Sequence, residues 1–313
     1  MPSQRSFNRA EAFWRGRFQR PTRVKMEILA SAMLPTLAKL TKEEKAAERD
    51  EADSLITQRG MGKKAFAHVN KPDFILQLRS RVRQPKLINQ GHLGFCAPAA
   101  ILYAMAKDSP LEYATFALDL FFRGKATVRG WQVDVSHLLD QNVPASLDPA
   151  ATSIGACDWV TMAGVRTNVG FGAALTSVNM NVEGALPFEI VSCFKSLGYQ
   201  NVLNETYSTI LWKADENNLR QASKLWGQGY RVVFCVNANM FHNATAQSLK
   251  PNHFCTLKSA VRIATSVTCR VWQWGINDKE PTTAGSSIYV DLPKDQFMAA
   301  YFGFVAAGDR RLG

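Results

Sequence analysis

The chain has 313 residues, 46% of them hydrophobic and 20% charged, a balance that can build a buried core. No run reaches about 18 apolar residues and no apolar stretch follows Met1, so we expect neither a membrane span nor a signal peptide. The six cysteines are scattered and form no CxxC pair, which indicates reduced thiols, a cytosolic working compartment and no zinc finger.

The net charge of +11 is concentrated near the N-terminus. Residues 1–86 hold 19 Lys and Arg against 9 Asp and Glu, whereas the rest of the chain is almost neutral. Such a segment is typical either of a protein that binds nucleic acid or an acidic partner, or of a solvated helical extension. We favour the extension and expect no nucleic-acid partner, because aromatic and basic residues stop interleaving after Arg20.

The N-terminal quarter is predicted to be a basic, largely helical extension over residues 1–80, followed by one domain over residues 81–313. Thr41 and Glu44, three positions apart, form a capping-box pattern. A strongly charged helix is expected to begin there and to end near Gly60.

Apolar helices are predicted to dominate the middle of the chain. One of about four turns should begin near Cys96, because Gly91 and Gly94 make a tight approach and Pro98 is tolerated in a first helical turn. A second helix is expected from Pro110. Further helices are predicted around residues 150–170, 187–199 and 219–230, with a glycine- and asparagine-rich loop over residues 171–184.

The last third of the chain is predicted to be rich in β-structure. Residues 230–240 should form a strand, and residues 253–263 and 267–275 should form an antiparallel hairpin, because both segments alternate and a short link joins them. Two more short strands are expected at residues 286–293 and 301–307. Helices followed by an antiparallel sheet indicate an α+β domain.

One cysteine and one histidine stand out as a nucleophile and its base. Cys96 should lie at the N-terminus of a buried helix, where backbone amides favour a thiolate. Gln90, six residues earlier, is placed to donate to an oxyanion. Of the five histidines, His253 opens a strand and can face a helix end, whereas His92 is the rival base close to Cys96.

These segments resemble those of papain-like cysteine peptidases. The run from Gln90 to Ala97, QGHLGFCA, resembles the Q-G-x-x-G-x-C-W segment of that family. GYRVVFCVNA and NHFCTLKSA are similar to its strand before the histidine and its histidine strand, and VWQWGIN resembles its later Asn and Trp-Gly segment. The resemblance implies a papain-like α+β fold, with a helical part carrying the nucleophile packed on an antiparallel sheet carrying the histidine.

Residues 87–307 also resemble bacterial proteins that are found near type VI secretion genes and treated as cysteine-peptidase toxins. The elements that carry this likeness are GFCAPAA, LDLFFRGKA, CDWVTMAGVR, NANM, PNH, WQWG and YFGFVAA.

The family resemblance assigns roles residue by residue. Cys96 would attack the carbonyl, His253 would pair with it and protonate the leaving amine, and Gln90 would help form the oxyanion hole. The family's Asn falls on Trp272, so the residue that orients the histidine stays open among three nearby polar positions. These positions are Gln273, Asn277 and Asp278. Candidate substrate-binding residues are Gly94, Asn237, Asn239 and Trp274, although the two asparagines are equally suited to capping their loop.

The predicted function is a cysteine peptidase that cuts protein substrates without a metal or cofactor. The second resemblance implies a delivered antibacterial toxin that acts in a reducing target-cell cytosol, with an immunity protein and a secretion apparatus as partners. Two alternatives stay open. The same pair of residues suits a peptidoglycan amidase or a glutamine deamidase, and the uncertain third position suits a catalytically dead adaptor.

Overall fold

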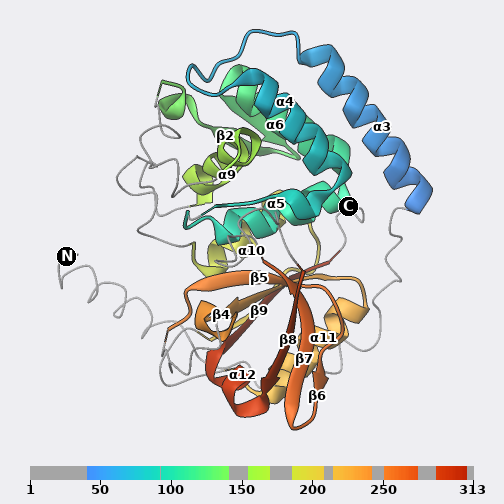
Figure 1. Ribbon diagram of the computed structural model, residues 1–313, viewed down its shortest axis with the longest axis vertical. Helices are drawn as coiled ribbons and strands as arrows, with labels where there is room; N and C mark the ends of the chain where they lie inside the picture. Colours follow the sequence, from blue (N-terminus) through green and yellow to red (C-terminus); the bar gives the residue numbers. More distant parts are fainter. Residues whose placement is uncertain are drawn as a thin grey trace, which may run out of the picture. The chain divides into compact units, whose positions relative to one another are not determined.

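The computed structural model divides the chain into two compact units, Met1–Ala38 and Lys39–Gly313. The structure describes residues 41–91, 93–140, 154–169, 185–207, 214–241, 250–273 and 287–308, all within the second unit (Figure 1). The expected loop over residues 171–184 lies outside these ranges. In the part of the chain that is described, no helix is long and apolar enough to cross a membrane.

The first two described helices belong to the same core as the rest of the second unit. Helix α3 (Lys42–Arg59) begins at the predicted capping box, in which the Glu44 amide donates to Thr41 Oγ1 at 3.1 Å and the Thr41 amide donates to Glu44 Oε2 at 2.8 Å. Helix α4 (Lys71–Arg83) follows, and both pack against α6 (Pro110–Arg123). Their buried residues are Ala52, Ile56, Phe74, Leu78 and Val82.

The boundary expected near residue 80 therefore does not separate compact units. The compact unit begins at Lys39, because the apolar faces of α3 and α4 are buried in the common core. The basic residues on the exposed faces of α3 and α4 suggested an extension outside the domain. The buried apolar faces of the same helices place both of them inside it.

Helix α5 (Cys96–Asp108) is the central element of the fold. Every residue from Cys96 to Ala106 is buried, which is expected of a helix that is apolar all round. It packs against α6 and α9 (Ala156–Val169) on one side and against strand β5 on the other (Figure 1). The helices predicted from Cys96, from Pro110 and around residues 150–170 are confirmed.

A short hairpin follows α6. Strands β1 (Lys125–Val128) and β2 (Trp131–Asp134) pair antiparallel and are joined by Arg129 and Gly130, both at positive φ. Two positive φ values are the requirement of a type I′ turn. This hairpin was not predicted from the sequence.

A seven-stranded antiparallel sheet carries the second half of the fold. Its order is β3-β9-β4-β5-β7-β6, and β8 also pairs with β7. The expected pairing of the two segments at residues 253–263 and 267–275 is confirmed, with β5 opposite β7. The strands are β3 (Leu203–Thr206), β4 (Arg231–Val236), β5 (His253–Leu257), β6 (Arg262–Ile263), β7 (Ser266–Trp272), β8 (Ser287–Pro293) and β9 (Tyr301–Ala307).

Helices contact this sheet from two sides. Cys235, Phe254 and Trp272 belong to the core that contains α5 and α10 (Pro187–Ser196). Phe234 and Tyr301 make an edge-to-face contact, and α11 (Glu216–Gly227) and α12 (Lys294–Ala300) pack near them. The domain is therefore α+β with an antiparallel sheet, as the sequence predicted.

Candidate active site

The loop before α5 delivers Cys96 to the helix N-terminus. Gly91 adopts φ +60°, and its amide donates to Asn89 Oδ1 at 2.9 Å, which makes a tight turn. The Leu93 amide then donates to the Gln90 carbonyl at 3.3 Å. Cys96 is the first residue of α5 and is 5% exposed. The turn and the helix start are those that the sequence predicted.

A buried ion pair between α4 and α9 holds the loop before Cys96 in place. Asp158 on α9 is fully buried and accepts from Arg81 Nη2 at 2.6 Å and from Arg81 Nε at 3.2 Å. The backbone amide of Asn89 donates to the same carboxylate. Burial alone would lower the pKa of Arg81, but the charge of Asp158 more than offsets it and keeps the guanidinium protonated. The pair thus ties α4 and α9 to the turn that precedes the cysteine.

Side-chain amides brace the connection that delivers His253. Asn237 follows β4, and its Nδ2 donates to the Lys250 carbonyl at 2.8 Å, while its Oδ1 accepts from the Asn239 amide at 3.0 Å. The Asn252 amide donates to the β4 carbonyl of Val236 at 3.1 Å. Asn237 is 2% exposed, so its side chain closes this loop. Asn237 was considered either for binding substrate or for capping its loop, and these hydrogen bonds are those of a loop cap.

The N-termini of α5 and β5 meet at the Cys96 sulfur. The backbone amide of Phe254 faces the sulfur, together with the amides of Cys96 and Ala97. Cys235 on β4 lies close enough to interact electrostatically with Cys96. Two segments far apart in the sequence are therefore brought together, and three backbone donors surround one sulfur.

Burial nevertheless raises the pKa of the Cys96 thiol above its ordinary value, although the three amides lower it in part. The helix N-terminus was expected to produce the opposite net shift. The difference arises because the sulfur is desolvated on all sides, and the groups that lower its pKa are neutral amides and not a charged partner.

His253 opens β5 beside this cysteine and is half-buried. Phe254 packs in the core with α5, so strand alternation favours the opposite side for the neighbouring imidazole. The His253 ring lies 6.1 Å from the Phe241 ring, edge to face. Among the hydrogen bonds of the described residues, none joins the Cys96 thiol to the His253 imidazole.

Gln90 lies in the same loop as Cys96 and is buried, with 9% of its surface exposed. Its Oε1 atom has no hydrogen-bond partner within the described ranges. A buried amide oxygen without a partner costs free energy, which a bound donor would recover. Gly94, between Gln90 and Cys96, is half-buried.

The register of β5 and β7 bears on the residue that would orient His253. Trp272 lies opposite Thr256. One further step along this antiparallel register places Gln273 opposite Cys255, and so on the same face of the sheet as His253. Gln273 is half-buried. The other positions named for this role or for substrate, Trp274, Asn277 and Asp278, lie outside the described residues, as does His92.

Trp272, which stands where the family has its Asn, binds α5 to the sheet. Its ring stacks on Tyr103 with centroids 4.0 Å apart, and its Nε1 donates to the Lys86 carbonyl at 3.2 Å. Neither this anchor nor the tie between Arg81 and Asp158 was predicted from the sequence. The signal for the tie was Asp158 itself, because a carboxylate in an apolar helix beside a large aromatic residue needs a charged partner once it is buried. Trp159 is buried and packs against Phe95.

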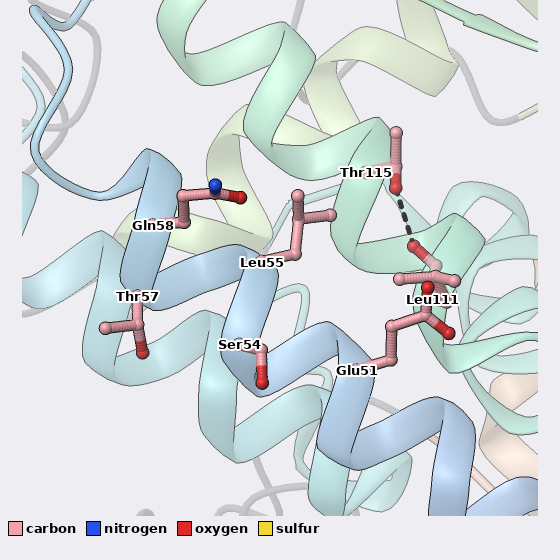
Figure 2. A pocket seen from close by; sticks show the side chains of 7 residues that line it. All are labelled: Glu51, Ser54, Leu55, Thr57, Gln58, Leu111 and Thr115. Atoms are coloured by element: carbon pink, nitrogen blue, oxygen red, sulfur yellow. Dashed lines mark hydrogen bonds between the residues drawn. The ribbon is translucent and has the colours of Figure 1, made fainter.

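A separate pocket lies between α3 and α6 (Figure 2), and none of the residues that line it belongs to the Cys96 loop or to α5. It has a volume of about 780 Å³, and Glu51 is its only ionisable side chain. Thr115 Oγ1 within it donates to the Leu111 carbonyl at 2.9 Å. It holds no nucleophile paired with a base. The described residues also contain no group of three or more His, Cys, Asp or Glu that could hold a metal ion.

Any functional assignment of this chain rests on the geometry above, because comparison with known proteins found no match. No family model matches the chain, and no curated protein or solved structure matches it either.

Proposed function

We propose that the protein is a papain-like cysteine peptidase with Cys96 as its nucleophile and His253 as its base. The observation that carries the proposal is the convergence of the Phe254, Cys96 and Ala97 amides on the Cys96 sulfur. It sets the start of the histidine strand against the start of the cysteine helix, which is the arrangement that a thiolate and an imidazole require.

The reaction would proceed through an acyl-enzyme. The Cys96 thiolate forms a bond to the substrate carbonyl carbon, and the carbonyl electrons move to oxygen, beside the Gln90 amide. The imidazolium of His253 gives its proton to the leaving amine as the C–N bond breaks. Water then attacks the thioester and loses a proton to His253, and the acid is released as the C–S bond breaks, which restores the Cys96 thiolate and the His253 imidazolium.

This proposal requires the start of β5 to shift, so that the His253 imidazole leaves Phe241 and reaches the side of the strand on which Cys96 lies. Once protonated, the imidazole would place a positive charge beside the sulfur, and this charge would lower the pKa of the Cys96 thiol. Gln273, which directly follows β7, would steady the ring.

The six cysteines are all free and buried, which supports a reducing place of action such as a target-cell cytosol. Toxicity on expression in the cytosol is therefore the first test, with newly formed protein termini in those cells as the direct readout. Both are expected in the wild type and not in Cys96→Ala or His253→Ala. Cys193→Ala, a buried cysteine on α10, is the matched control and should behave as the wild type.

The outcomes separate the competing activities. Toxicity that depends on Cys96 but produces no new protein termini would indicate an amidase or a deamidase. A second candidate is a non-catalytic papain-like module. The raised pKa of Cys96 and its lack of a hydrogen bond to His253 among the described residues favour it. That module predicts identical effects of wild type and Cys96→Ala.

A further inference from the structure

The C-terminal end of α5 carries a cluster of cationic side chains that the proposed reaction does not use. Lys107 Nζ and Lys258 Nζ lie 5.9 Å and 5.1 Å from the centroid of the Tyr103 ring. Lys258 donates to the Tyr103 hydroxyl. Tyr103 is itself stacked on Trp272. Both lysine nitrogens therefore lie close to one aromatic ring that the core holds in place.

The carboxylate at this cluster is already engaged. Asp108 accepts from Arg231 Nε at 2.8 Å and from a second guanidinium nitrogen, and Lys45 Nζ lies 3.9 Å away. Among the ion pairs of the described residues, neither Lys107 nor Lys258 has a carboxylate partner. Arg231 and Lys45 thus lie at the Asp108 carboxylate, and Lys107 and Lys258 add two more basic side chains beside Tyr103. Among these residues, basic side chains outnumber carboxylates.

The surroundings of Lys107 favour the neutral form of its amine. Burial, followed by the charges of Arg231 and Lys258, lowers the pKa of Lys107 to about 6, although Asp108 opposes the shift. The amine is therefore mostly neutral at pH 7.5. The titratable and charged groups around it are Tyr103 and Asp108 on α5, Lys45 on α3, Tyr199 after α10, Arg231 on β4 and Lys258 directly after β5.

We propose that Lys107, Lys258 and Arg231 form a binding site for a doubly charged tetrahedral oxyanion, a sulfate or a phosphate group. Such an anion accepts several charge-assisted hydrogen bonds at once. The side chains of Lys45, Asp108 and Arg231 are between 15% and 19% exposed, so solvent reaches the cluster. Lys107 lies about 16 Å along α5 from Cys96 by helix rise, so the site is distinct from the proposed active site.

Inorganic sulfate is the probe of choice, because its charge does not change near neutral pH. Calorimetric titration at pH 7.5, at constant ionic strength set with chloride, should show binding to the wild type. Repeating it in buffers of different ionisation enthalpy should show proton uptake, because the bound anion favours protonated Lys107. The same linkage predicts weaker binding as the pH rises from 6 to 8.

Two variants and a control complete the test. Lys258→Met should weaken sulfate binding roughly tenfold or more, since a charge-assisted hydrogen bond is lost. Lys107→Met should remove the proton uptake as well as weaken binding. Lys63→Met, at an exposed lysine, should leave both unchanged. Inorganic phosphate and glycerol phosphate, titrated in the same way, distinguish a site for the free ion from one that accepts a phosphate carried on a larger molecule.

The proposal is overturned if sulfate does not bind the folded wild type, if it binds without proton uptake, or if both lysine variants bind it as the wild type does. Should Lys107→Met fail to fold, proton uptake by the wild type and the affinity of Lys258→Met still decide. None of these results depends on whether Cys96 is catalytic.

Discussion

The ion pair between Arg81 and Asp158 is expected to be the strongest single electrostatic support of the loop that carries Cys96. Asp158 is fully buried, the Arg81 side chain is 12% exposed, and their closest atoms are 2.6 Å apart. Asp158→Ala would leave a charged guanidinium in the core without a partner. The expected loss is about 3–5 kcal/mol of unfolding free energy, out of a total of roughly 5–15 kcal/mol for a typical domain.

Urea denaturation at pH 7, followed by tryptophan fluorescence, measures this loss. Arg81→Met should cost a similar amount, because it leaves the carboxylate buried and unpaired. The double variant Arg81→Met/Asp158→Leu should cost only about 1–3 kcal/mol, since it leaves mainly the Asn89 amide unsatisfied. Lys125→Ala, which breaks an exposed pair with Asp134, is the control and should change stability by less than about 1 kcal/mol.

Two results would refute this reasoning. One is a cost below about 1 kcal/mol for each single variant, which would mean that water solvates the pair. The other is a double-variant cost equal to the sum of the single costs, which would mean that the two side chains do not interact.

Three further predictions follow from the geometry. Gly303→Ala should destabilise the fold by several kcal/mol in urea denaturation, because a Cβ there would lie 2.1 Å from a β3 carbonyl. Gly130→Ala, also at positive φ but in open space, should cost only about 1–2 kcal/mol. Equal costs for the two variants would contradict this. Asn237→Ala should cost about 1–3 kcal/mol, with increased hydrogen exchange in the loop before β5; unchanged exchange would show that the amide does not brace it. In a folded His253→Ala variant, in which only neutral amides face the sulfur, alkylation of Cys96 by iodoacetamide should accelerate with pH to above about 8.5, the ordinary cysteine pKa; a plateau below pH 7 in that variant would contradict the buried neutral thiol.

Local signals in the sequence predicted several helices and strands correctly. The pattern of Thr41 and Glu44 identified the start of α3, because a capping box is read from residues three apart. Alternation in β5 and β7 predicted their antiparallel pairing. The hairpin of β1 and β2 was missed, since its turn places Arg129, an ordinary residue, at positive φ.

The extent of the compact unit could not be predicted in the same way. Helix α3 buries only Ala52 and Ile56, so its sequence looks like that of a solvated helix. Its place in the core depends on the face that α6 offers, which no local pattern in α3 reveals.

At the site, the sequence indicated which segments meet but not the environment they create. Cys96 and the start of β5 do lie together, as their motifs predicted, and their roles stay predictions. The sign of the Cys96 pKa shift depends on how completely α5 is buried against β4 and β5, which is a property of tertiary packing. Likewise, the side of the sheet that Trp272 faces follows from the register and not from its spacing in the motif.

Covalent labelling with an epoxysuccinyl peptide inhibitor, mapped by mass spectrometry near pH 7, tests the central claim most directly. Such a reagent needs a nucleophilic thiol, and its epoxide oxygen needs a proton from a neighbouring acid. The account predicts labelling of the wild type at Cys96 alone, and a large loss of labelling in a folded His253→Ala variant. No labelling of Cys96, or equal labelling with and without His253, would contradict the assignment of this pair as nucleophile and base.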